Sequence, residues 1–340
     1  MAGEKRIEKV KRRKKMNVIG KIRVYKRSGN IFKKIICVFK FKLQTFLIYF
    51  PFRFFLGIRP HENEVYYSNY KFYYVLKKRF QRILSRLPVY EENPLPNEKI
   101  IWWCWLQGEE NAPDLCRACL SSLRRNLPDF KINVVTEKNM WNLITVPEYI
   151  RNKYEKGIIS RTHFSDILRT CLLVEHGGVW IDSTVYCTGC HNDILSENLF
   201  YFSNIMRGDK GISFSNWLIS AHKKEPVLMS IRDLLFLYWK NHNLLYHYFI
   251  YHFFGTMALE KYPEIAEKVP VFSNIPPHIM QNELFDEYSE KRFAHYVQMS
   301  DFHKLTYKFS EHQNTKNTVY KAILNMENVL ESQKTGAKNE

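Results

Sequence analysis

The chain has 340 residues, of which 45% are hydrophobic and 25% charged, and its formal net charge is +17. This composition excludes a wholly disordered chain, and the length allows one large α/β domain with an appendage. The charge is uneven, because residues 1–97 hold 24 Lys and Arg against 6 Asp and Glu, whereas residues 98–340 hold 27 against 28. We therefore divide the chain into a basic, aromatic-rich arm and linker (1–97), a main domain (98–320) and a C-terminal tail (321–340).

The N-terminal arm mixes cations with large apolar side chains. It opens with the basic run at residues 11–15, and its most apolar stretch, residues 43–52, lies between Lys42 and Arg53. That stretch supplies about half of the roughly 20 apolar residues that a membrane-spanning helix needs, and the arm lacks the order of a signal peptide. We therefore expect a cytoplasmic protein whose basic helical arm binds the anionic inner face of the cytoplasmic membrane. A solvated basic helix and a nucleic-acid-binding segment are the alternatives, although we expect no nucleic acid as a partner.

The main domain is predicted to begin after a linker rich in Pro and Asn at residues 91–97. Residues 99–106 are dense in Ile and Trp and predict a buried strand. A helix is predicted from residue 113 to about 126, followed by a strand at residues 130–136. The order strand, helix, strand predicts a mostly parallel α/β sheet that binds ligands at the carboxyl ends of its strands.

Two Cys-x-x-Cys pairs, at residues 116–119 and 187–190, could form a zinc site if the fold brought all four thiols together. The first pair lies in the predicted helix at the spacing of a buried face. We therefore interpret these cysteines as small core residues with reduced thiols.

The clearest helix is predicted at residues 160–178, where apolar residues recur every three or four positions and Gly177 with Gly178 provides the stop. Asp166 and Arg169 lie three residues apart on a neighbouring face, a spacing that also suits an ordinary surface ion pair. Residues 179–186 then predict one apolar strand that carries Asp182. A buried carboxylate needs a metal, a donor or water. Because the sequence shows no partner for it, we expect replacement of Asp182 by Ala to abolish activity and leave the fold intact.

Two further helices are predicted at residues 225–240 and 246–262, both rich in Leu, Phe and Tyr. His242, His247 and His252 recur at about helical spacing, but no acid accompanies them. We interpret these residues as partly buried histidines.

The motifs FSDILR (residues 164–169) and GGVWID (177–182) resemble the signature of glycosyltransferases with a DXD-type sugar-binding region. The bacterial capsular polysaccharide synthesis family is the most similar, because it also accounts for WLQG (105–108), Asn216 with Trp217, and HKLTYK (303–308). The resemblance covers about residues 98–310. It implies a GT-A-like, single Rossmann-type domain and a hexosyltransferase that uses a nucleoside diphosphate sugar, with UDP sugars favoured. The acceptor it implies is a growing capsular or lipopolysaccharide-type glycan, free or lipid-linked, and the configuration is retained.

The same resemblance implies roles for the donor-binding residues. Trp105 would stack on the nucleotide base, and Asp166 with Arg169 would contact the ribose and the donor sugar. Asn216 would lie beside the donor sugar or the acceptor. Arg169 and Asp182 are the catalytic candidates, since a guanidinium can bind phosphate or sugar oxygens in a bidentate manner.

Asp182 matches the first acid of the DXD element and is expected to hold Mn²⁺ or Mg²⁺, partly through water. The third position of that element is Thr184, so a second carboxylate ligand is missing. His303 is expected to complete the coordination, and Lys304 or Lys308 to neutralise the diphosphate. The missing acid and the basic arm also favour an alternative class, a nucleotide- or polyanion-binding protein with a degenerate transferase site.

Overall fold

In the computed structural model, the described residues are Phe39, Leu43, 61–93, 98–190, 193–204, 211–309 and 317–336. The basic run at residues 11–15 lies outside the described residues, as does the apolar stretch at 43–52 apart from Leu43. The predictions that depend on these two segments stay predictions.

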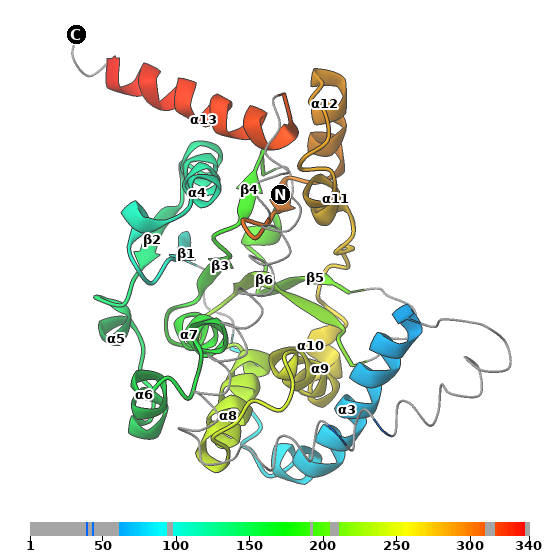
Figure 1. Ribbon diagram of the computed structural model, residues 1–340. Helices are drawn as coiled ribbons and strands as arrows, with labels where there is room; N and C mark the ends of the chain where they lie inside the picture. The colour runs from blue at the N-terminus through cyan, green and yellow to red at the C-terminus, as the bar shows by residue number, and fades with distance from the viewer. Residues whose placement is uncertain are drawn as a thin grey trace, which may run out of the picture.

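A five-stranded sheet of order β2-β1-β3-β6-β5 forms the centre of the described chain (Figure 1). Its strands are β1 (Ile100–Cys104), β2 (Lys131–Val135), β3 (Gly178–Ile181), β5 (Leu199–Ser203) and β6 (Phe214–Ala221). β1 pairs in parallel with β2 and β3, whereas β6 is antiparallel to both β3 and β5. Four of these five strands therefore point the same way, and the predicted α/β domain with a mostly parallel sheet is confirmed.

Helices cover both faces of this sheet. α7 (Arg161–His176), α8 (Pro226–Asn241) and α9 (Ile250–Lys261) lie on one face, and α4 (Asp114–Asn126) and α13 (Val319–Gly336) lie on the other side (Figure 1). The strands alternate between the faces, since Trp102 and Trp180 pack toward α7 while Ile101 and Val179 pack toward α4. The remaining described helices are α3 (His61–Leu84), α5 (Met140–Leu143), α6 (Glu148–Glu155), α10 (Pro263–Ala266), α11 (Pro276–Asn282), α12 (Glu290–Met299) and the short 3₁₀ turns Glu109–Asn111 and Asp193–Leu195.

Local sequence signals explain the helix that carries the FSDILR motif. Ser160 caps α7 by accepting a hydrogen bond from the backbone N–H of His163, and Gly177 ends the helix with φ 71°. Gly178 follows with φ 91°, and a Cβ atom there would lie 2.6 Å from the carbonyl oxygen of Ile100. Glycine is therefore required where β3 approaches β1. The predicted buried positions of Cys116 and Cys119 in α4 are also confirmed.

The prediction of one continuous strand at residues 179–186 is wrong. β3 ends at Ile181, the chain turns at residues 182–184, and β4 (Val185–Cys187) pairs with β7 (Phe302–Lys304) in a separate two-stranded sheet. The backbone N–H of Val185 donates to the carbonyl of Asp182 across this turn at 3.0 Å. A turn removes the Asp182 carboxylate from the apolar sheet and places it among polar partners, which lowers the cost of burying it.

The predicted helix at residues 246–262 begins four residues later, because α9 starts at Ile250. The hydroxyl of Tyr238 accepts a hydrogen bond from the backbone N–H of Tyr246 at 3.0 Å. This bond satisfies the backbone N–H of Tyr246 in the segment that connects α8 to α9.

Segments from both ends of the chain pack on the main domain. α3 buries Tyr73, Leu76, Phe80 and Leu84 in the same core as α7, α8 and α9. α13 packs against α4, and Glu327 of α13 pairs with Arg125 at 2.5 Å. The boundaries at residues 97 and 320 stay predictions. No helix among the described residues combines the length and the apolarity needed to cross a bilayer.

Candidate functional site

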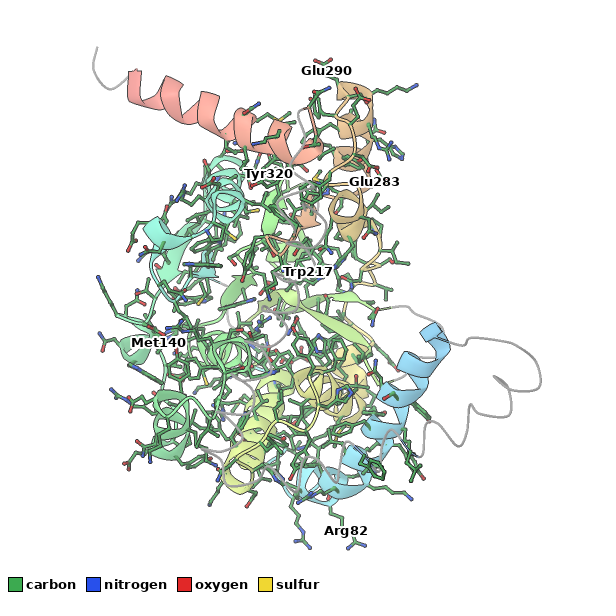
Figure 2. All side chains as sticks on the ribbon, in the orientation of Figure 1. Arg82, Met140, Trp217, Glu283, Glu290 and Tyr320 are labelled. Atoms are coloured by element: carbon green, nitrogen blue, oxygen red, sulfur yellow. The ribbon has the colours of Figure 1, made fainter. Side chains whose placement is uncertain are left out.

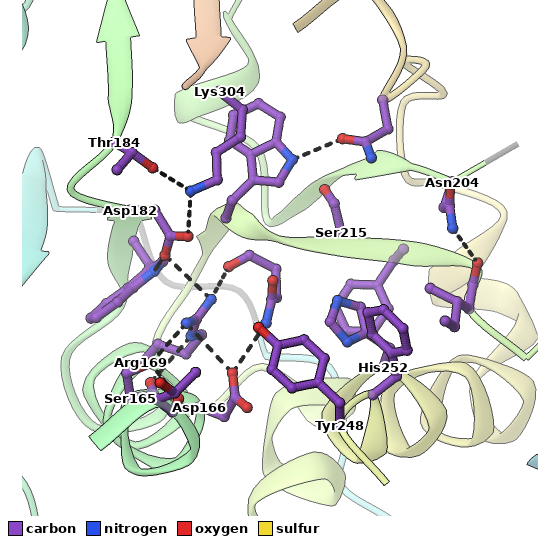
Figure 3. A pocket seen from close by; sticks show the side chains of 18 of the residues that line it. Ser165, Asp166, Arg169, Asp182, Thr184, Asn204, Ser215, Tyr248, His252 and Lys304 are labelled. Atoms are coloured by element: carbon purple, nitrogen blue, oxygen red, sulfur yellow. Dashed lines mark hydrogen bonds and ion pairs between the residues drawn. The ribbon is translucent and has the colours of Figure 1, made fainter. Parts of the chain in front are cut away.

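A cavity of about 670 Å³ opens at the carboxyl end of β3. Its wall comes from α7, the turn after β3, the first residues of β6, the segment before α9 and the segment around β7 (Figure 3). This volume lies within the range of small-molecule sites in proteins. The sheet therefore forms a pocket where the strand order predicted ligands to bind.

Arg169 is the central cation of this cavity, and its side chain is only 6% exposed. Its guanidinium nitrogens lie 3.5 Å from carboxylate oxygens of both Asp166 and Asp182. It also donates hydrogen bonds to the carbonyl oxygens of Ser165 and Asn216, and it lies 4.9 Å above the ring of Trp180. Burial acts to lower the pKa of Arg169, but the two carboxylates outweigh burial and the pKa is raised. The guanidinium is thus charged and fixed in orientation.

Asp166 and Asn216 form one wall of the site. The Asn216 side-chain amide donates to the Asp166 carboxylate at 3.1 Å. Asp166 comes from α7 and Asn216 from β6, so this bond joins the helix to the start of the strand. Both side chains line the cavity and offer polar atoms to a ligand.

Asp182 lies in the turn after β3, and its backbone N–H donates to the carbonyl of Trp217 in β6 at 2.8 Å. Its carboxylate accepts from the indole N–H of Trp180 at 2.9 Å and pairs with the ammonium of Lys304 at 2.9 Å (Figure 3). Burial acts to raise the pKa of Asp182, but Lys304 and Arg169 outweigh burial and the pKa lies below its ordinary value. The carboxylate is therefore ionised, and it has the partners that the sequence did not reveal.

Lys304 reaches this carboxylate because β7 pairs with β4. The register places Lys304 opposite Val185, directly after the Asp182 turn. The ammonium nitrogen also donates to the Thr184 hydroxyl at 2.5 Å. A residue 122 positions away in the chain therefore joins the acid-bearing turn.

The structure places His303 on the other face of β7. Its Nε2 lies 3.1 Å from the Thr188 hydroxyl, and its side chain is 1% exposed and does not line the cavity. Neighbouring residues of a strand point to opposite faces, so Lys304 and His303 cannot both face Asp182. Burial lowers the pKa of His303 to about 4.

Trp105 lies beside the cavity without lining it. Its ring packs edge-on against Tyr307 at a centroid distance of 5.5 Å, and Tyr307 lines the cavity. The structure therefore brings together Asp166, Arg169, Asp182, Asn216 and Lys304, and it leaves Trp105 and His303 outside this group.

The side chains around Asp182 do not fit the divalent ion that the resemblance implies. Mn²⁺ or Mg²⁺ takes several oxygen ligands in a set geometry. Here the one carboxylate of the turn already pairs with two cations, and the Thr184 hydroxyl accepts from Lys304. Within the described part of the chain, no group of three or more His, Cys, Asp or Glu residues could hold a metal ion. The Mn²⁺ or Mg²⁺ site and the role of His303 in it stay predictions.

Sequence reasoning missed several residues of the cavity wall. Tyr248 is 61% exposed at its rim, and its ring lies 5.5 Å from that of His163. His252 is buried deeper, and burial lowers its pKa to about 4. Asn274 accepts a hydrogen bond from the indole N–H of Trp217 at 2.8 Å. Tyr248 and Asn274 come from connecting segments, where the sequence offered no local signal for them, and His252 was interpreted from sequence only as a partly buried histidine.

Residues 53–323 match the family model of the capsular polysaccharide synthesis protein family, and the chain belongs to that family. The predicted membership is therefore confirmed.

Individual proteins are similar to parts of the chain. An uncharacterized glycosyltransferase of Acanthamoeba polyphaga mimivirus is 24% identical over 151 residues, which is 42% of this chain and 56% of that protein. The chain thus spans a little over half the length of this relative. The PaToxG glycosyltransferase structure is 17% identical, with a TM-score of 0.38, and the match covers 75% of this chain and 96% of that one. The bacterial N-acetylglucosamine transferase NleB is 9% identical, with a TM-score of 0.30 and coverage of 61% and 95%.

Proposed function

We propose that this protein is a GT-A-type glycosyltransferase that moves a hexose from a nucleoside diphosphate sugar, with UDP sugars favoured, to a growing capsular or lipopolysaccharide-type glycan. Transfer retains the anomeric configuration. The observation that carries the proposal is the cavity at the carboxyl end of β3, where Arg169, Asp182 and Lys304 form one connected charged group. Membership of the capsular polysaccharide synthesis protein family and the similarity to a viral glycosyltransferase support it.

The charges of the cavity suit the chemistry of this reaction. Breaking the bond between the anomeric carbon and the diphosphate leaves negative charge on the leaving group, and fixed cations stabilise that charge. Arg169 is held by two carboxylates and two carbonyls, so it does not have to reorganise during the step. Asp166 and Asn216 offer oxygen and nitrogen atoms to sugar hydroxyls.

The exposed ring of Tyr248 supports an acceptor site at the rim of the cavity. It belongs to the connection between α8 and α9, and it lies over the same cavity as Asp166. An aromatic face that is open to solvent can pack against the apolar face of a sugar ring. We assign the acceptor sugar to this position.

We further propose that the protein works at the anionic inner face of the cytoplasmic membrane. The outward face of α3 exposes Tyr70, Tyr74 and Val75 at 41%, 50% and 58%. The exposed cations of the same face and of the turn after α3 are Lys78, Arg79, Arg82 and Arg86. Arg82 points away from the body of the protein (Figure 2), and residues 65–90 contain no Asp or Glu. Such a basic and aromatic surface suits anionic headgroups.

A donor-panel assay with the purified full chain tests the proposed reaction. Release of nucleoside diphosphate is measured with UDP- and GDP-hexoses, with and without a glycan acceptor. We expect slow release with one donor alone and faster release with acceptor. The alternative is a binding protein with a degenerate transferase site. It would be favoured if wild type and Asp182→Asn both bind nucleotide and neither releases nucleoside diphosphate from any donor.

A further inference from the structure

The turn after β3 and the end of β7 together form a site for a cation. The resemblance implies a metal on Asp182, and Thr184 stands where the second acid of the DXD element would be. The Lys304 ammonium lies 2.9 Å from the Asp182 carboxylate and 2.5 Å from the Thr184 hydroxyl. A protein cation therefore bridges the two side chains of the turn at which the resemblance implies a metal.

We propose that the Lys304 ammonium takes the place of the divalent ion, and that this protein binds and neutralises the donor diphosphate without a metal. The proposal rests on the proposed function, since it concerns the same donor site. It departs from the metal site that the resemblance implies, because the side chains observed around Asp182 do not fit that site.

The fold holds Lys304 in this position from two sides. Lys304 pairs with Val185 across the β4–β7 sheet, and the backbone N–H of Leu305 donates to the carbonyl of Thr184 at 2.8 Å. The backbones of the two segments are thus hydrogen-bonded at the point where the side chains meet. Only 20% of the Lys304 side chain is exposed, and the residue lines the cavity. An ammonium so placed is available to a ligand inside the cavity.

The charge of the cavity favours an anion over a second cation. Its wall contains two carboxylates, Asp166 and Asp182, and three Lys or Arg side chains, Arg169, Lys304 and Lys308. A divalent ion on the Asp182 carboxylate would have to displace Lys304, and it would lie near the Arg169 guanidinium, which is 3.5 Å from the same carboxylate. Like charges at such distances repel strongly in a half-buried site. A diphosphate instead adds negative charge where cations are in excess.

The transfer step balances without a metal. The bond between the anomeric carbon and the diphosphate oxygen breaks, and its electron pair passes to that oxygen, to which Lys304 donates the one N–H that Asp182 and Thr184 leave free. The acceptor hydroxyl oxygen forms the new bond to the anomeric carbon. Its proton passes to the released diphosphate.

Calorimetric titration of the full chain with UDP and with GDP, in buffer that contains EDTA, tests the proposal. We expect wild type to bind one of them without metal. Lys304→Gln removes the charge and should weaken this binding about 10- to 100-fold, whereas Lys304→Arg should retain more of it. Lys99→Gln is the matched control. Lys99 is 62% exposed, and in the described part of the chain its ion pair is with the surface residue Asp129. It should bind as wild type does.

Electron paramagnetic resonance of Mn²⁺ provides a readout that does not depend on activity, and its measurement on wild type does not depend on the folding of any variant. The Mn²⁺ signal measured with wild type and UDP should be the same as the signal measured with UDP alone. The double variant Thr184→Asp with Lys304→Gln restores the second acid and removes the ammonium, and it should bind Mn²⁺.

The outcomes separate this proposal from the proposed function. Donor turnover that persists in EDTA supports the proposal. If EDTA abolishes nucleotide binding or turnover by wild type, and Mn²⁺ restores it, the proposal is overturned. The glycosyltransferase function is then still supported. Absence of nucleotide binding and of donor turnover, with metal and without it, overturns both.

Discussion

Replacing Asp182 by Asn should reduce the stability of the folded protein as well as its activity. The carboxylate lies 3.5 Å from a nitrogen of Arg169 and 2.9 Å from that of Lys304. At an effective dielectric constant of about 20, one such contact has a Coulomb energy of about 4 kcal/mol. Much of this energy is offset, because the variant no longer desolvates a carboxylate and Arg169 keeps Asp166 at 3.5 Å. We therefore expect a loss of about 2 kcal/mol, less than the roughly 3 to 5 kcal/mol for breaking a fully buried pair.

The measurement is thermal and urea unfolding of wild type, Asp182→Asn and the control Asp129→Asn. A loss of about 2 kcal/mol corresponds to a Tm lower by roughly 4 to 8 °C for a domain of this size. Asp129 is 77% exposed and lies 3.7 Å from Lys99, so its variant should change the free energy of unfolding by less than about 0.5 kcal/mol.

The pH dependence provides a second check on the same residue. The pKa of Asp182 is lower in the folded protein than its ordinary value. Its stabilising contribution is therefore present above the unfolded pKa of about 4 and is lost as the pH falls through the lower folded pKa. The stability difference between wild type and Asp182→Asn should shrink in that acidic range. An equal Tm for the two proteins at pH 7 would refute the pairing described here and would restore the expectation, made from sequence, that removal of Asp182 leaves the fold intact.

The other predictions concern separate parts of the molecule. Arg169→Lys should lower kcat/KM for transfer at least about 100-fold, because an ammonium cannot reproduce the guanidinium contacts; steady-state kinetics that match wild type would remove it from the site. Tyr248→Ala should raise the acceptor KM several-fold and leave donor hydrolysis unchanged, whereas an equal loss in both would contradict an acceptor role. Glu225, the N-cap residue of α8, is buried, and burial raises the pKa of its carboxyl to about 7. Its contribution to stability is therefore lost as the pH rises from about 4.5 through 7. Glu225→Gln should be more stable than wild type at pH 8 in urea unfolding, and equal stability would contradict the burial of this carboxyl. Arg79→Glu with Arg82→Glu should weaken sedimentation with phosphatidylglycerol vesicles at least about tenfold, and unchanged sedimentation would exclude α3 as the membrane-binding surface.

Much of the fold follows from signals that are local in the sequence. The apolar repeat and the two glycines predict α7 to within two residues at each end, and the apolar runs predict β1 and β2 with the same accuracy. The same local signals place Asp166, Arg169 and Asp182 at one end of the sheet, because a helix face and the end of the following strand are fixed by short-range geometry. The errors lie at residues 182–184, where a turn ends β3 and the chain goes on to pair with β7, and at the start of α9, where residues 246–249 connect it to α8.

The partner of Asp182 was decided by the tertiary structure alone. His303 and Lys304 are neighbours in the chain and were both candidates for the site from sequence. The register between β4 and β7 turns Lys304 toward Asp182 and His303 toward Thr188. A shift of this register by one residue would exchange the two side chains, since side chains alternate along a strand. Strands more than 100 residues apart fix such a register through their packing, and no local pattern in either strand specifies it.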